Sequence, residues 1–162
     1  MKKKLILWIA CILWAFMIFM FSHQTAEKSA DLSQSFSAKI IIFLAEHGVI
    51  DIPVSSTGFL EAVSKIAESV DTFVRKLAHF SIYAVLGVLS YELSLCYTQN
   101  KRAVIIALIG CFFYAVSDEI HQTFIPGRAG MITDVLLDFC GSFSGVFIYS
   151  LIFKRNHKKI RM

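Results

Sequence analysis

Four long apolar runs are the feature that most restricts how this chain can fold. They cover residues 5–21, 77–95, 103–118 and 135–153. Each run is close to the roughly 17–25 residues with which a helix crosses the hydrocarbon core of a bilayer. Across the chain, 56% of the residues are hydrophobic and 17% are charged, whereas about a quarter of the residues in a soluble domain are charged. The sequence therefore predicts an all-α membrane protein with four transmembrane helices in one domain, residues 1–162.

The first run resembles a secretory signal peptide in one respect, because Lys2, Lys3 and Lys4 precede it. The apolar core of a signal peptide is usually only about 7–15 residues long and ends at a small-x-small cleavage site. The run here is longer, and the sequence Ser-His-Gln-Thr-Ala-Glu after Phe21 offers no good site of that kind. We therefore expect a retained first transmembrane helix.

The segment between the first two spans, residues 22–76, is polar and too long for a simple turn. It contains two amphipathic stretches, at residues 36–45 and 59–77. In the second stretch, apolar residues recur every three or four positions with charged residues opposite, which is typical of a one-faced helix. We expect one or two outer amphipathic helices. They either lie on the membrane surface and lead into the second span, or pack against the extramembrane face of the bundle.

Basic residues mark one end of each span. Ten of the 16 Lys and Arg residues lie before residue 5, in the connection at residues 96–102, or after residue 153. Beside apolar spans, such clusters indicate the cytoplasmic side of the membrane rather than a nucleic-acid partner. Four spans satisfy all three assignments, so we predict a multi-pass protein of the cell membrane with both termini in the cytoplasm. Residues 22–76 and 119–133 then lie outside the cell.

Polar and ionisable residues concentrate between the third and fourth spans. Residues 117–128 read Ser-Asp-Glu-Ile-His-Gln-Thr-Phe-Ile-Pro-Gly-Arg, and Asp134 and Asp138 follow them. Ionisable groups in or beside lipid are costly unless they are partnered, so such groups are a functional-site hypothesis by default. We therefore place the candidate site here, at the outer leaflet.

Helical spacing brings polar residues of the other segments to the same level. Arg75, His79 and Tyr83 are four residues apart and form one stripe at the start of the second span. Gln24 follows the end of the first span. If the helices form a bundle, these side chains converge on the polar segment between the third and fourth spans.

The fourth span carries carboxylates and small residues on one face. Asp134 and Asp138 are one turn apart, and the Gly-x-x-x-Gly sequence at residues 141–145 continues their face. Two glycines at this spacing let helix backbones approach closely. The face that bears the carboxylates is therefore predicted to pack tightly against another helix.

Several chemistries remain open for these residues. A histidine beside a carboxylate can act as a general base, but no Gly-x-Ser-x-Gly elbow or cysteine site supplies a nucleophile. His79, His121 and one or two of the Asp residues could instead bind a divalent metal, although their spacing matches no metal motif. Arg128 could hold a phosphate or carboxylate through two parallel hydrogen bonds. The remaining alternative is a buried polar network that only fixes helix packing.

Three short motifs are distributed along the chain. They are Phe21-Ser22-x-Gln24, Arg75-Lys76-x-x-His79-Phe80-x-x-Tyr83, and Asp118-Glu119-x-His121-Gln122-x-Phe124-x-Pro126-Gly127-Arg128. Together with Asp134 and the Gly141/Gly145 helix, they resemble the VanZ-like family. The resemblance implies a small multi-pass membrane protein of the bacterial cell envelope. The family's namesake is associated with low-level resistance to teicoplanin, a glycopeptide antibiotic that targets cell-wall precursors outside the membrane.

One position departs from the family pattern. The VanZ-like family commonly has Asn where this chain has Asp138. The difference adds a carboxylate to the candidate site. Asp138 then acts either as an acid or as a protonated stand-in for an amide.

Two functional classes follow from the residues and the resemblance. In the first, the cluster is an active site that acts on an envelope lipid or a lipid-linked wall precursor. The residues expected to perform acid–base or metal chemistry are Asp118, Glu119, His121, His79 and Asp134. The residues expected to bind the substrate and its anionic headgroup are Arg128, Arg75, Gln122, Tyr83, Asp138 and Gln24. In the second class, the cluster binds or shields a headgroup without turnover. A transporter is disfavoured, because only Glu92 lies far from the outer interface.

Overall fold

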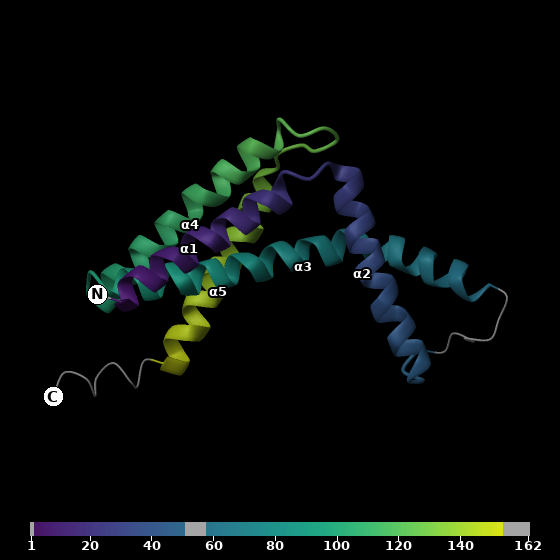
Figure 1. Ribbon diagram of the computed structural model, residues 1–162, viewed down its shortest axis with the longest axis horizontal. Helices are drawn as coiled ribbons and strands as arrows, with labels where there is room; N and C mark the ends of the chain where they lie inside the picture. Colours follow the sequence, from purple (N-terminus) through teal and green to yellow (C-terminus); the bar gives the residue numbers. More distant parts are fainter. Residues whose placement is uncertain (1, 51–57, 154–162) are drawn as a thin grey trace.

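The computed structural model describes residues 2–50 and 58–153, which form five helices and no strand within those ranges (Figure 1). The helices are α1 Lys2–Ser22, α2 Ala26–Glu46, α3 Phe59–Leu95, α4 Asn100–Gln122 and α5 Ile132–Phe153. Helices α1, α3, α4 and α5 are long and apolar enough to cross a membrane. The prediction of an all-α membrane protein with four spanning helices is therefore confirmed. The basic residues after residue 153, which contributed to the predicted orientation, lie outside the described part of the chain.

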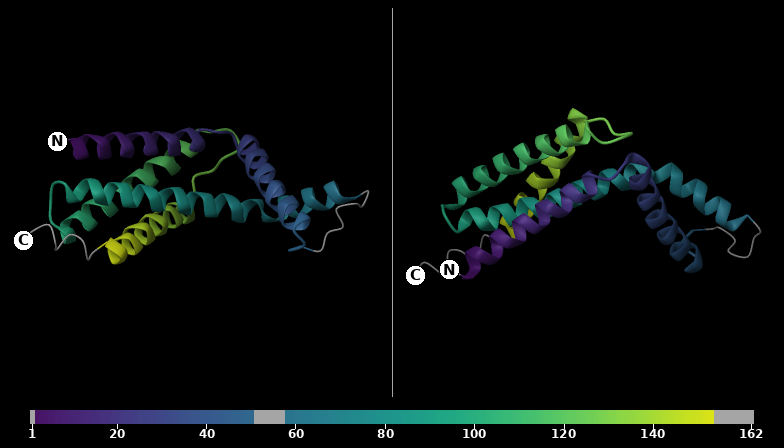
Figure 2. Two further views of the ribbon diagram at one scale, coloured as in Figure 1. Left: turned by 60° about the horizontal axis from the view of Figure 1, so that its bottom comes forward. Right: turned by 45° about the horizontal axis from the view of Figure 1, so that its top comes forward.

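Helix α3 is the centre of the molecule, because it packs against each of the other four helices (Figures 1 and 2). At one end of the bundle, α1 starts beside the end of α3, and Lys3 lies 3.1 Å from Glu92. We call this end the basic end, since Lys101 at the start of α4 lies there as well. At the opposite end, α1 and α4 finish and α5 begins (Figure 2). We call it the site end.

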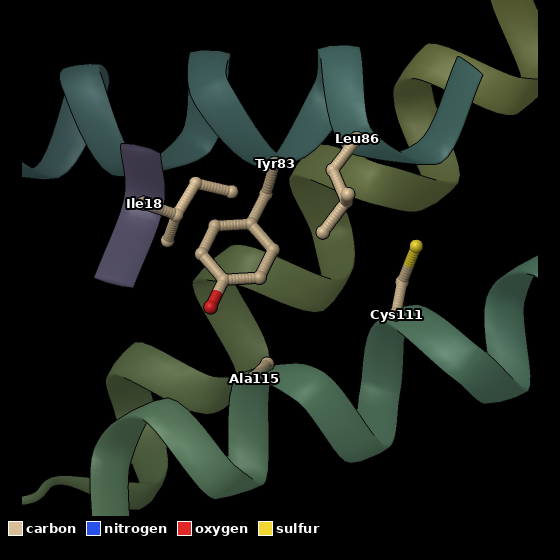
Figure 3. Close-up of a cluster of buried hydrophobic side chains, with 5 residues drawn as sticks. All are labelled: Ile18, Tyr83, Leu86, Cys111 and Ala115. Atoms are coloured by element: carbon tan, nitrogen blue, oxygen red, sulfur yellow. The ribbon is translucent and has the colours of Figure 1, made fainter. Parts of the chain in front are cut away.

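The surface and the interior of the bundle differ as expected for a protein surrounded by lipid. Large apolar side chains are exposed on the spanning helices, among them Ile12, Phe113 and Phe147. Inside, small residues recur every four positions along α4, at Ala103, Ala107, Cys111 and Ala115, and all are buried. Small residues at helix interfaces allow close packing, which drives helix association where the surrounding lipid is as apolar as the side chains. In Figure 3, the Tyr83 ring lies among Ile18, Leu86, Cys111 and Ala115, between α1, α3 and α4.

The closest helix contact is the seam between α3 and α5. A Cβ atom added at Gly141 would overlap the carbonyl oxygen of Phe80, and one at Gly145 would overlap that of Ala84. On the other side of the seam, a Cβ atom at Gly87 would lie 2.5 Å from the carbonyl oxygen of Ser142. The close approach predicted from the Gly-x-x-x-Gly sequence is confirmed. It presses the carboxylate-bearing face of α5 against α3.

The amphipathic stretch at residues 59–77 and the second apolar run form one continuous helix, α3, of 37 residues. At about 1.5 Å per residue, this helix is roughly 55 Å long, well beyond the hydrocarbon core of about 30 Å. Helix α2 crosses its first half (Figure 1). The apolar face of that half is covered by α2 through a cluster of Ile41, Ala45, Phe59, Val63 and Ala67. We call α2 and this half of α3 the arm.

Candidate functional site

A group of polar side chains lies inside the bundle at the site end. We call it the polar cluster, and its members are Ser22, His79, Tyr83, Asp118, Glu119, Gln122 and Asp138. All of them except His79 are buried. They come from α1, α3, α4 and α5, so the predicted convergence of these segments is found. On α3, His79 and Tyr83 are one turn apart and face the same neighbours.

His79, Asp118 and Asp138 form the innermost part of the polar cluster. One ligand atom from each of these three side chains lies within 4.8 Å of the other two. Nδ1 of His79 is 3.6 Å from Oδ1 of Asp138, whose side chain is 0% exposed. Among the described residues, no hydrogen-bond partner exists for His79 Nδ1, Asp118 Oδ1 or either carboxylate oxygen of Asp138. A buried carboxylate without partners is costly, so this arrangement differs from an ordinary packing network.

Glu119 and Gln122 are hydrogen-bonded, in contrast to His79 Nδ1, Asp118 Oδ1 and the Asp138 carboxylate. Oε2 of Glu119 accepts a hydrogen bond of 2.9 Å from the backbone N–H of Met131, just before α5. Nε2 of Gln122 donates to Asp118 Oδ2 and to Glu119 Oε1, both at 3.3 Å. Oε1 of Gln122 accepts from Nη1 of Arg128 at 3.3 Å. These hydrogen bonds connect the loop at residues 123–131 to the end of α4.

A pocket of about 340 Å³ opens beside the polar cluster, between the arm, the loop at 123–131 and the start of α5. Its charged and titratable lining residues are Arg75, Lys76, His79, Arg128 and Asp134. Arg75 forms an ion pair of 3.0 Å with Asp71 on the same helix. Lys76 lies 3.9 Å from Asp134. Three basic side chains therefore surround this space, which we call the basic pocket, and His79 belongs both to its wall and to the polar cluster.

Arg128 is the basic residue of the pocket that forms no ion pair with a described residue. It follows Gly127, whose φ of 75° is a backbone conformation that favours glycine. Its guanidinium contacts Gln122 and the backbone oxygen of Phe21, at 3.3 and 3.5 Å. Burial, together with the nearby charge of Arg75, lowers the pKa of Arg128 from its usual value. An anion in the pocket would relieve this repulsion between like charges.

A family model described as VanZ/LLP1 matches residues 7–153 of the chain. The chain belongs to this family. No curated protein and no solved structure match it. The match covers α2 to α5 and all but the first five residues of α1, and thus the polar cluster and the basic pocket. Family membership and four spanning helices together make this VanZ/LLP1 protein a multi-pass membrane protein.

His121 of this VanZ/LLP1 protein faces α1 and is not part of the His79 group. Its Nε2 lies 3.2 Å from Nδ1 of His23. Its ring lies 4.5 Å from the ring of Phe19. At about 100° per residue, positions 118 and 122 of α4 differ by about 40°, whereas position 121 lies about 60° to the other side of 118. The structure therefore does not bring together His79 and His121, which the sequence suggested as joint metal ligands.

The other predicted site residues fall into two groups. Tyr83 is 0% exposed and its hydroxyl has no partner among the described residues. Asp134 and Gln24 are at the periphery, where Asp134 faces Lys76 and Gln24 lies in a separate groove beside α1. Two further residues belong to the site although they were not among the predicted catalytic or substrate-binding residues. Lys76 lines the basic pocket, and the buried hydroxyl of Ser22 lies at the end of α1. Both residues occur in the motifs quoted above, so those motifs were the sequence feature that could have identified them as site residues.

Proposed function

We propose that this VanZ/LLP1 protein binds the phosphate-bearing headgroup of an envelope lipid or lipid-linked wall precursor in the basic pocket. The observation that carries the proposal is the convergence of Arg75, Lys76 and Arg128 around one space with a single facing carboxylate, Asp134. Guanidinium groups suit phosphate, because they offer several N–H donors in a fixed plane. The acyl or polyprenyl chain of such a ligand would remain in the bilayer beside the exposed apolar surface of the bundle.

The distribution of basic residues supports placing the pocket on the extracytoplasmic side. Lys2, Lys3, Lys4, Lys101 and Arg102 all lie at the basic end, opposite the pocket. Positive charges next to spans favour the cytoplasm. In this orientation both termini are cytoplasmic, and the pocket opens at the outer leaflet of a bacterial cell membrane, where wall precursors are used.

The position of His79 favours action on the headgroup over binding alone. His79 lines the pocket, and its Nδ1 faces the buried carboxylate of Asp138 at 3.6 Å. A carboxylate behind an imidazole orients the ring and favours its protonated form, as required for proton transfer to or from a bound ligand. We therefore assign His79 the role of acid–base group, with Asp138 and Asp118 behind it and the arginines as headgroup ligands.

Headgroup binding can be tested with purified full-length protein and water-soluble short-chain lipids. We expect anionic phosphatidic acid to bind at least about tenfold more tightly than zwitterionic phosphatidylcholine. Arg128→Gln should weaken binding of the anionic lipid about tenfold, since one charge-assisted hydrogen bond contributes roughly 1.5–3 kcal/mol. Arg102→Gln removes an exposed arginine at the basic end and is the matched control. Equal affinity for both lipids, or an Arg128→Gln protein that binds like the wild type, would overturn the proposal.

The source of the headgroup and its turnover require separate measurements. A polyprenyl-diphosphate-linked precursor competing better than phosphatidic acid would identify a wall precursor, and the reverse order would identify a phospholipid. Mass spectrometry of the bound lipid after incubation then reports turnover. His79→Gln is expected to abolish turnover and to preserve most of the binding. If the bound lipid stays unchanged on wild-type protein, the alternative of a binding or shielding protein replaces the enzymatic role.

A link to glycopeptide antibiotics follows only if the ligand is a wall precursor. The VanZ namesake's association with teicoplanin then leads us to propose reduced teicoplanin susceptibility in cells that express this protein. The measurement is the minimal inhibitory concentration with wild-type protein, Arg128→Gln and Arg102→Gln. Equal values for the wild type and Arg128→Gln would remove this link.

A further inference from the structure

Unpaired polar atoms are concentrated at one place in the bundle. Among the described residues, eight buried side-chain nitrogen or oxygen atoms have no hydrogen-bond partner, and five of them belong to His79, Tyr83, Asp118 and Asp138. Asp138 is 0% exposed and Asp118 is 3% exposed. In folded proteins, the large majority of buried polar atoms are paired. Such a concentration therefore indicates that these atoms have a ligand.

The charge of this group is also unbalanced. Asp118 and Asp138 contribute up to two negative charges, and a protonated His79 balances only one of them. Two other basic residues nearby are paired elsewhere, because Arg75 pairs with Asp71 and Lys76 faces Asp134. Arg128 forms no ion pair with a described residue, and its guanidinium contacts Gln122 and the backbone oxygen of Phe21 rather than either carboxylate. A divalent cation would balance both carboxylates.

We propose that His79, Asp118 and Asp138 form a binding site for one divalent transition-metal ion. Their ligand atoms lie within 4.8 Å of one another. Three ligand atoms that bind one metal ion at about 2.1 Å are roughly 3.0–3.6 Å apart, so on metal binding the widest of these separations would shorten by about an ångström. The three residues come from α3, α4 and α5, and the glycine seam holds α3 and α5 together. The frame of the site is therefore rigid.

The ligand set points to a particular class of metal. One imidazole nitrogen with two carboxylate oxygens suits Zn²⁺ or Mn²⁺, whereas Mg²⁺ and Ca²⁺ favour sites made only of oxygen ligands. Three protein ligands leave further coordination positions free, which is typical of catalytic rather than structural metal sites. His79 also lines the basic pocket. The ion would therefore lie next to any anion bound there, but the three ligands would hold it whether or not a headgroup is present. A His79 that binds the ion is neutral, so the metal site replaces the acid–base role proposed for His79 above and leaves the proposed headgroup binding unchanged.

Metal binding can be measured without any knowledge of the substrate. Full-length protein with a tag free of histidine is stripped with a chelator, titrated with Zn²⁺ or Mn²⁺, and analysed for bound metal. Electron paramagnetic resonance of Mn²⁺ gives the affinity independently. We expect about one ion per chain, and an affinity at least about tenfold lower in His79→Gln, Asp118→Asn and Asp138→Asn. Asp71→Asn removes a buried carboxylate of the arm, and His121→Gln removes a histidine outside the group. Both controls should bind metal like the wild type.

Thermal unfolding keeps the test decisive if one of the variants folds poorly. A ligand that binds only the folded state raises its stability, so Zn²⁺ or Mn²⁺ should raise the Tm of the stripped wild type. That shift should disappear in Asp138→Asn and persist in Asp71→Asn. No bound ion and no Tm shift in folded wild-type protein, or unchanged metal affinity in Asp138→Asn, would overturn the metal site. Headgroup affinity of the stripped protein, measured with phosphatidic acid, separates this result from a failure of the headgroup proposal.

Discussion

The two ends of the bundle treat their carboxylates in opposite ways, one half-buried and the other buried. At the basic end, Glu92 accepts hydrogen bonds from Lys3 at 3.1 Å and from the hydroxyl of Tyr149 at 3.0 Å. At the site end, neither oxygen of Asp138 has a hydrogen-bond partner among the described residues. Residues of the bundle thus donate hydrogen bonds to the carboxylate of Glu92, whereas none donates a hydrogen bond to the carboxylate of Asp138 among the described residues. A carboxylate that only supports packing is expected to resemble Glu92, so the difference distinguishes the structural ion pair of Glu92 from the candidate functional site.

The arm, outside the core of the bundle, also contains a carboxylate with partners. Asp71 is buried there, and it accepts a hydrogen bond from Ser33 and pairs with Arg75. This chain therefore pairs the buried carboxylate of the arm and the half-buried carboxylate of the basic end. Asp138, whose two oxygens have no hydrogen-bond partner among the described residues, differs from both.

The largest expected effect concerns which end of the bundle faces the outside of the cell. An introduced thiol at either end is either labelled in intact cells or not labelled at all. In a background without the native cysteines, Phe124→Cys places a thiol on the loop at the site end, where Phe124 is 78% exposed. Gln99→Cys places one at the basic end, before α4. We expect a membrane-impermeant maleimide to label the first variant in intact cells and the second only after permeabilisation. The reverse pattern would move the basic pocket to the cytoplasmic side.

Separating α3 from α5 should have the largest effect on stability. Gly145→Leu forces a side chain into the backbone of α3 at Ala84. We expect a loss of at least about 3 kcal/mol in the free energy of unfolding, at the upper end of overpacking effects. Gly110→Ala, on the exposed face of α4 with nothing within 4 Å, should be nearly neutral. Denaturant titration in detergent measures the free energy of unfolding of both variants. Equal changes in the two variants would contradict the tight packing of α3 against α5 at the seam.

Neutralising one carboxylate at each end should change stability in opposite directions. Glu92→Gln loses the ion pair with the exposed Lys3 and weakens the bond from Tyr149, and we expect a cost of about 1 kcal/mol. Asp138→Asn loses only the 3.6 Å contact with His79 and removes a buried charge whose oxygens have no hydrogen-bond partner among the described residues, so metal-stripped protein should gain about 1 kcal/mol. The free energies of unfolding of the stripped variants are compared at one pH. A destabilised Asp138→Asn protein would mean that Asp138 is paired in the way Glu92 is.

The smallest effect is expected at the rim of the basic end. Nε1 of Trp8 donates a hydrogen bond of 2.9 Å to the hydroxyl of Tyr97, at an exposed position. Trp8→Phe removes the donor, and we expect a loss of about 0.5 kcal/mol, since water can replace an exposed partner. Thermal unfolding should therefore shift little. A large shift would show that this rim is more important for stability than its exposure suggests.

Helical periodicity predicted the parts of the fold that depend on one segment at a time. The apolar runs located the four spanning helices. The four-residue spacing of His79 and Tyr83 placed them on one side of α3, and the spacing of Gly141 and Gly145 predicted a close helix contact. These features depend on the geometry of a single helix, which the sequence specifies directly.

Other features depend on how helices are rotated and paired, and the sequence did not specify them. His121 was expected to act with Asp118, but α4 turns it toward His23 on α1. The lack of hydrogen-bond partners around Asp138 depends on where Arg75, Lys76 and Arg128 point, and each of them is held by other groups. The packing of α2 on the first half of α3 was not predicted. The sequence left open whether this amphipathic stretch lies on the membrane surface or packs against the extramembrane face of the bundle, because an amphipathic face fits a membrane surface and a helix equally well.

The continuity of α3 has a mechanical consequence. From Phe59 at the tip of the arm to His79 in the polar cluster, the chain is one uninterrupted helix, about 30 Å of rod at about 1.5 Å per residue. A rod without a hinge cannot absorb a push at one end. A tilt of the arm would therefore be carried along α3 to His79, which immediately precedes the close contact of Phe80 with Gly141 on α5. The position of the arm and the position of His79 are thus mechanically connected.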